Sequence, residues 1–129
     1  MNFNKTILPG IIEIVPKVHK DNRGYLIENF QKDEFKKNGI PVDFDYSYVF
    51  NLNSSTKPIK INNGADVVIR CIEGKIKLSI YDQKKSLTID LDSNEHIQYY
   101  IPEEYSFIIE ELCDSSIVEI CSSASIQIP

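Results

Sequence analysis

Short runs in which hydrophobic and polar residues alternate dominate the chain. In residues 75–81, Ile76, Leu78 and Ile80 fall on one side of an extended strand, and polar residues fall on the other side. Residues 86–91 repeat this alternation, so we predict a strand over each of these two segments. The other predicted strands, chosen for their β-branched and aromatic content, are residues 10–15, 46–52, 67–72, 97–101, 106–112 and 117–121.

Turn-forming residues separate these strands, and helix signals are scarce. Glu73 and Gly74 lie between two strand-like runs and predict a hairpin turn. Only residues 32–38 have a helical pattern, in which Asp33 is placed to cap the helix and Gly39 to end it. Many short strands with one short helix indicate an all-β sandwich or a small barrel.

The composition is that of a globular chain, and it excludes some functions. A chain of 129 residues predicts a single domain over residues 1–129, with 42% hydrophobic and 26% charged residues. The net charge of −5 argues against a nucleic-acid or anionic-membrane surface. No apolar run approaches the length of a membrane span, and residues 1–9 lack a secretion-signal pattern, so we expect a cytoplasmic protein without membrane partners.

The residue types that bind metals or form disulfides are few and dispersed. The chain has three cysteines, and their spacing matches no metal site. We expect them to be small buried hydrophobic residues rather than reactive thiols. The two histidines, His19 and His96, are too far apart to form a metal cluster, and no glycine-rich phosphate loop is present. The sequence therefore predicts neither a metal nor another cofactor.

Four segments, in order along the chain, carry a resemblance to a known family. They are Pro-Gly at residues 9–10 followed by Asp-Asn-Arg-Gly and Glu-Asn-Phe within residues 21–30, the short helix at residues 35–40, the strand, turn and strand at residues 68–82, and the corner at residues 100–105. In this pattern the chain resembles the dTDP-4-dehydrorhamnose 3,5-epimerase family and, more loosely, the related dTDP-sugar ketoisomerases. The resemblance implies an all-β jelly-roll cupin.

The resemblance also implies a nucleotide site and a homodimer. The family uses an Arg and a Glu of the first segment to hold the nucleotide, and these match Arg23 and Glu28. An arginine suits phosphate oxygens because its guanidinium is planar and permanently charged. Without the resemblance, the same two residues are more typical of a surface pair in a turn before a strand. The family dimerises by exchanging N-terminal strands, for which residues 10–15 are the natural candidate.

The residues that would perform the family's chemistry are absent from their expected places. Moving a proton beside a sugar ketone needs a base, usually His, and an acid on the other face, which the family supplies as Tyr. The segment that should carry the His, residues 54–64, has none. The family's Lys falls at Val67, a second His at Phe107 and the Tyr at Ile120. This pattern predicts a divergent member with an apolar pocket, in which the catalytic residues are unknown.

Replacements for the missing groups are few. His19 and His96 are more typical of solvated loop histidines than of a relocated base. A carboxylate whose pKa is raised by an apolar pocket can act as a base, and Asp66, Glu73 and Glu119 lie near the relevant strands. More often such residues lie on a solvated face or in a turn.

Three functions remain open within a setting of deoxysugar and surface-polysaccharide metabolism. The first is an active dTDP-4-keto-6-deoxyhexose 3,5-epimerase or ketoisomerase with a replaced base. The second is a non-catalytic member that binds a sugar nucleotide or pairs with a catalytic partner. The third is a structural interaction module with a closed pocket. The missing groups favour the last two over the first.

Overall fold

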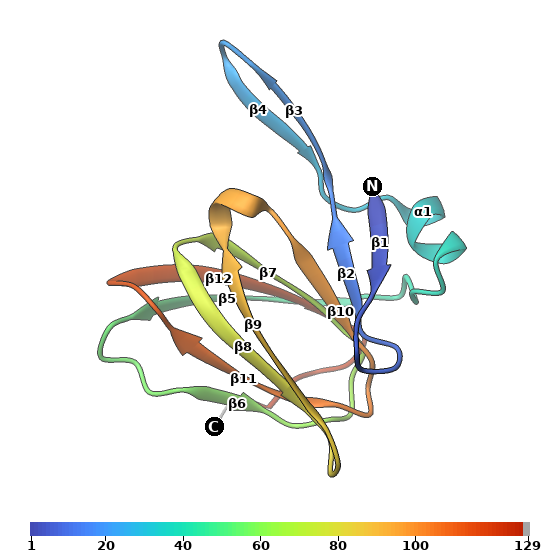
Figure 1. Cartoon of the computed structure of the whole chain (residues 1–129), viewed down its shortest axis with the longest axis vertical. Helices are drawn as coiled ribbons and strands as arrows, with labels where there is room; N and C mark the ends of the chain where they lie inside the picture. Colours follow the sequence, from blue (N-terminus) through green and yellow to red (C-terminus); the bar gives the residue numbers. More distant parts are fainter. Residues whose placement is uncertain (128–129) are drawn as a thin grey trace.

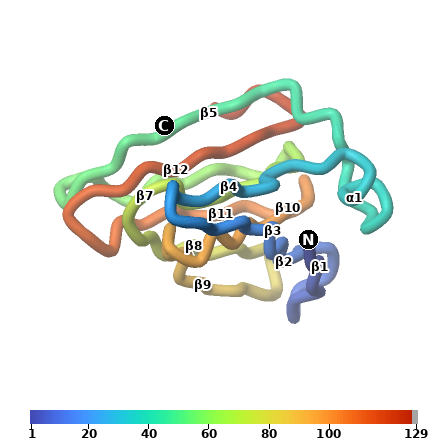
Figure 2. Tube along the Cα trace, turned by 90° about the horizontal axis from the view of Figure 1, so that it is seen from above, coloured from blue at the N-terminus to red at the C-terminus, as the bar shows by residue number. Residues whose placement is uncertain are grey.

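Two antiparallel sheets face each other in the computed structural model, which describes residues 1–127 (Figure 1). In Figure 2 strands β5 and β12 lie on one side of the molecule and β8 and β9 on the other. The six-stranded sheet has the order β1 (Asn2–Lys5), β2 (Ile12–Val15), β10 (Gln98–Ile101), β7 (Val67–Glu73), β12 (Ser115–Ser122) and β5 (Tyr46–Asn53). The four-stranded sheet has the order β6 (Ile59–Ile61), β11 (Ser106–Glu111), β8 (Lys75–Tyr81) and β9 (Ser86–Asp92).

This arrangement confirms the expected jelly roll, and each predicted strand coincides with an observed one. The sequence missed four short strands: β1, β6 and the pair β3 (Lys17–Asp21) and β4 (Gly24–Glu28). The sequence pattern did not predict β3 and β4 because their residues are mostly exposed on both faces and show no alternation of hydrophobic and polar residues. A strand without a buried face leaves no hydrophobic period in the sequence.

Strands β3 and β4 form a hairpin that projects from the body of the molecule (Figure 1). Tyr25 and Leu26 on this hairpin are among the exposed large hydrophobic residues. Residues 10–15, the expected exchanged strand, include β2, which lies between β1 and β10 within its own chain. Exchange of this strand between two copies stays a prediction. The projecting element is the hairpin that follows β2.

The main core fills the space between the two sheets. Its members come from alternate positions of the strands, as in the β8 residues Ile76, Leu78 and Ile80, which are all fully buried. A second, smaller apolar cluster lies on the outer face of the six-stranded sheet, where Phe35 packs with Val68 and Tyr100. Helix α1 (Lys32–Lys37) supplies Phe35, and this contact holds the helix against the sheet.

Two expectations about local structure were wrong. The residue that precedes α1 is Gln31, which makes no side-chain cap, and Asp33 lies in the first turn instead. There its negative charge is favourable to the helix dipole. Cys71 is buried as expected, but Cys113 is exposed and Cys121 is only partly buried.

Within residues 1–127, no helix is long and apolar enough to cross a membrane.

The tight turn between β7 and β8 gives a first prediction. Gly74 has a φ of +88°, and a Cβ atom at this position would lie 2.3 Å from Ser116 Oγ. Gly39 has a similar φ of +77° but nothing within 4 Å of the same atom. Gly39→Ala should cost about 1 kcal/mol of unfolding free energy for backbone strain alone, whereas Gly74→Ala should cost about 3 kcal/mol because it adds a steric clash.

Urea unfolding followed by circular dichroism would measure both variants, since the chain has no tryptophan. Equal losses in the two variants would show that the contact at Ser116 does not constrain the turn.

Candidate functional site

A cavity of about 280 Å³ opens between the two sheets at one end of the jelly roll. Its apolar floor is formed by Ile61 of β6, Val67 of β7 and Phe107 of β11. Its rim is polar, with Asn62 and Asn63 on one side. The remaining lining residues are Gly64, Ala65, Ser125, Ile126 and Gln127.

Hydrogen bonds between distant parts of the chain build the rim. The Asn63 amide donates to Ser106 Oγ (3.0 Å), and the Gly64 amide donates to the Glu103 carbonyl (2.8 Å). On the opposite side, the Ser123 amide donates to the Asp66 carbonyl (2.9 Å). These contacts bring the segment after β6 and the segment after β12 together at the opening.

The three positions where the resemblance places Lys, His and Tyr are buried in the main core. Val67 is 1% exposed, Phe107 is 2% exposed and Ile120 is fully buried. None of the ten residues that line the cavity carries an ionisable side chain. The wall of the cavity therefore offers hydrogen bonds and apolar contacts but no general acid or base.

Tyr48 is a polar residue near these positions that the sequence did not single out for catalysis. It lies directly opposite Ile120 in the pairing of β5 with β12. Its hydroxyl accepts a hydrogen bond from the Ile126 amide (2.9 Å) and donates to Ser125 Oγ (3.5 Å). The hydrogen bonds with Ser125 and Ile126 hold the pKa of Tyr48 below its ordinary value. A tyrosine therefore stands one strand away from the expected place, which only the strand register reveals.

The structure places both residues expected to hold a nucleotide on the projecting hairpin. Arg23 lies at its tip, where its side chain is 86% exposed and pairs with the Asp21 carboxylate at 2.5 Å. Glu28 ends β4 and meets His19 Nε2 at 2.6 Å, and this hydrogen bond lowers the pKa of the Glu28 carboxyl. The cavity at the open end has neither residue in its lining, so the structure does not bring the two features together within one chain.

The other candidate groups lie apart from one another. Asp66 accepts hydrogen bonds from Tyr100 Oη (3.1 Å) and from the Glu103 amide (3.0 Å). Glu119 forms an ion pair with Arg70 at 3.0 Å. His96 ends a 3-10 helix, η1 (Ser93–Glu95), with a φ of 60°. In the described part of the chain, no three His, Cys, Asp or Glu residues are placed to hold a metal ion.

The two facing antiparallel sheets, with a small cavity at one open end, define the class of protein as a jelly-roll cupin. The family model for dTDP-4-dehydrorhamnose 3,5-epimerase matches residues 5–119, and the chain belongs to this family. A similar protein is the dTDP-4-dehydrorhamnose 3,5-epimerase of Methanothermobacter thermautotrophicus. It is 28% identical over 129 aligned residues, which cover 90% of this chain and 68% of the relative.

Solved structures share the fold. The dTDP-4-dehydrorhamnose 3,5-epimerase of Elizabethkingia anophelis superposes with a TM-score of 0.87 at 19% identity, covering 98% of this chain and 76% of its own. A Legionella pneumophila epimerase in complex with dTDP-4-keto-L-rhamnose has a TM-score of 0.87 at 14% identity and covers 98% of this chain and 73% of its own. At these identities the likeness shows the fold.

The hydrogen bond at Tyr48 predicts how the segment at the opening is held. Tyr48→Phe removes the acceptor of the Ile126 amide, so this amide should exchange with solvent about fivefold faster, for a loss of about 1 kcal/mol. Hydrogen exchange measured by NMR would test this. Tyr46→Phe is the control, since Tyr46 lies on the same strand and its hydroxyl makes no hydrogen bond within residues 1–127. Unchanged exchange of Ile126 in Tyr48→Phe would contradict the proposed role.

Proposed function

We propose that this chain is a non-catalytic member of the dTDP-sugar epimerase family that binds a sugar nucleotide, alone or together with a catalytic partner. The observation that carries the proposal is the apolar packing at Val67, Phe107 and Ile120, where the resemblance places the three reactive side chains. Proton transfer needs a titratable group within hydrogen-bonding reach of the reacting carbon. The lining of the cavity supplies none.

The same cavity supports binding over a purely structural role. A closed structural module would have no ligand-sized space between its sheets, whereas this cavity holds about 280 Å³. Small-molecule sites usually begin near about 300 Å³. The rim offers side-chain amides from Asn62, Asn63 and Gln127, which can donate to and accept from sugar hydroxyls.

The hairpin supports a homodimer as the binding unit. Arg23 and Glu28 stand on an arm that leaves the body of its own chain (Figure 1). Tyr25 and Leu26 on that arm are 62% and 65% exposed, which leaves apolar area for a second copy to cover. In such a dimer the arm of one copy would carry its arginine toward the nucleotide at the open end of the other. The cytoplasm and deoxysugar metabolism are the proposed setting.

Proton NMR of dTDP-4-keto-6-deoxyglucose with the protein in heavy water tests the absence of catalysis. We expect the nucleotide signals to broaden while the sugar C3 and C5 protons keep their full intensity, because no base is placed to remove them. Loss of either sugar signal would overturn the non-catalytic proposal, and unchanged line widths would overturn binding.

If Arg23 of the hairpin contacts a phosphate of the nucleotide, Arg23→Ala should lower the affinity for dTDP. Loss of a charge-assisted hydrogen bond to a phosphate should weaken dTDP binding by about 1.5–3 kcal/mol, which is about 10- to 150-fold. Lys20→Ala removes one exposed positive charge from the same hairpin and should change affinity by less than about threefold. Isothermal titration would measure both variants. Equal affinities for the wild type and Arg23→Ala would remove the hairpin from the nucleotide site.

A second candidate function is an active epimerase or ketoisomerase with replaced groups, and two observations favour it. Tyr48 lies beside the position of the expected acid, with its pKa lowered. His19 on the arm is paired with the Glu28 carboxylate, an arrangement that orients an imidazole for proton transfer. If sugar protons exchange in heavy water, His19→Gln, which removes the candidate base, should abolish the exchange, and His96→Gln should not. Exchange that survives in His19→Gln would exclude this version of the site.

A further inference from the structure

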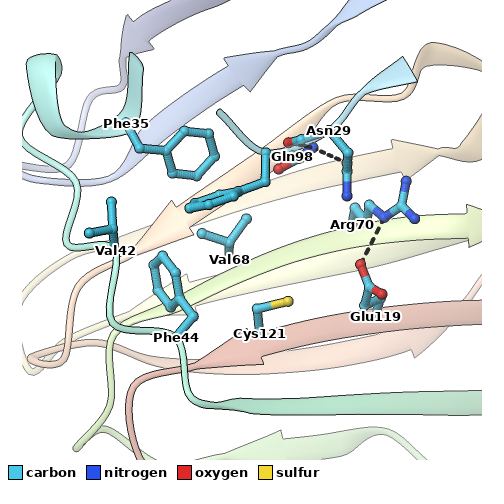
Figure 3. Close-up of a pocket in the computed structure, with 10 residues that line it drawn as sticks. Asn29, Phe35, Val42, Phe44, Val68, Arg70, Gln98, Glu119 and Cys121 are labelled. Atoms are coloured by element: carbon cyan, nitrogen blue, oxygen red, sulfur yellow. Dashed lines mark hydrogen bonds and ion pairs between the residues drawn. The ribbon is translucent and has the colours of Figure 1, made fainter. Parts of the chain in front are cut away.

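A second cavity, of about 290 Å³, lies on the outer face of the six-stranded sheet and is separate from the opening between the sheets (Figure 3). Its floor is formed by outward-facing residues of β7, β10 and β12, and one wall by the segment around α1. Two of its lining residues, Val68 and Phe35, also belong to the outer apolar cluster. Nothing in the proposed nucleotide site makes use of this space.

One part of the cavity is apolar and aromatic. Phe35, Val42, Phe44, Val68 and Cys121 line this part (Figure 3). The ring of Phe35 is held from two directions, since its centroid lies 5.6 Å from that of Phe3 and 4.8 Å from that of Phe30. A flat aromatic ring fits such walls because aromatic groups pack edge-to-face or offset against one another.

The other part of the cavity is polar and holds unused hydrogen-bonding groups. Gln98 is 2% exposed, and its amide nitrogen donates to the Asn29 carbonyl (2.9 Å) and lies against the Asn29 side-chain oxygen. Among residues 1–127, no hydrogen bond reaches the carbonyl oxygen of the Gln98 side chain, and this oxygen is not one of the buried atoms without a partner, so it remains accessible from the cavity.

The ion pair in the same wall is also only partly used. Arg70 reaches Glu119 through its Nε (3.0 Å), and in the described residues its two terminal nitrogens have no hydrogen-bond partner. Because the pair is close to neutral as a whole, it does not select a charged ligand. It presents free donors on the Arg70 side and a free carboxylate oxygen on the Glu119 side.

We propose that this outer cavity binds a small uncharged aromatic compound whose edge carries a hydrogen-bond donor next to an acceptor, as an aromatic carboxamide does. The ring occupies the space between Phe35, Phe44 and Val68. The ligand carbonyl accepts from the Arg70 guanidinium, and the ligand amide donates to the Gln98 side-chain oxygen. A volume of about 290 Å³ admits a ligand of one or two rings.

Benzamide is a direct probe of this site. Two related compounds separate the contribution of the aromatic ring to the affinity from that of the amide. Toluene keeps the ring without the polar edge, and cyclohexanecarboxamide keeps the amide without the aromatic ring. In NMR titrations of the ¹⁵N-labelled protein, benzamide should give saturable shifts at Phe44, Val68, Gln98 and Cys121. Each of the other two probes should bind about tenfold more weakly, the effect of losing about 1.4 kcal/mol.

A pair of variants tests the location. Cys121→Phe fills the cavity from its floor and should weaken benzamide binding at least tenfold. Ile117→Phe places the same ring on the same face of β12, outside the cavity lining, and should leave the affinity within about twofold. The shifts in the wild type keep the test valid even if a variant fails to fold.

Three results would overturn the proposal. They are the absence of saturable shifts, shifts that gather at Asn63 and Ser125 at the other opening, and equal binding by wild type and Cys121→Phe. Because the sugar-nucleotide experiments use another part of the molecule, their outcome leaves this test unaffected.

Discussion

Burial of the inner faces of the two sheets against each other is the interaction on which the rest of this structure depends. Alternate residues of nearly every long strand point inward, and the resulting core is mostly apolar. Both openings at the surface are consequences of this packing. One lies where the sheets part at an end, and the other lies where the outer face of one sheet meets the helix segment.

The same packing determines which side chains the interior can hold. Lys, His or Tyr side chains in the interior must keep their polar ends hydrated or hydrogen-bonded, which costs stability. Val67, Phe107 and Ile120, at the positions where the resemblance places such residues, have no such requirement and complete the core instead. The side-chain amides of Asn62 and Asn63 lie at the rim of the open end.

In contrast to the two facing sheets, the projecting hairpin is mostly exposed. It contributes little to the core, and its β3 and β4 residues pair only with one another. A two-stranded ribbon is marginally stable by itself, so a partner surface would stabilise it. On this ribbon, Arg23 lies against the Asp21 carboxylate and His19 against the Glu28 carboxylate. The hairpin thus links binding to association in the proposed function.

The sequence by itself determined the fold class and the positions of the long strands, because alternation with period two survives wherever one face is buried. It also predicted apolar residues at the positions where the resemblance places the catalytic side chains. Only the tertiary structure decided which residues become neighbours across strands. The register of β5 against β12 places Tyr48 beside Ile120, and helix packing creates the outer cavity around Arg70 and Gln98. Neither follows from local pattern, since register and side-chain packing depend on residues far apart in the chain.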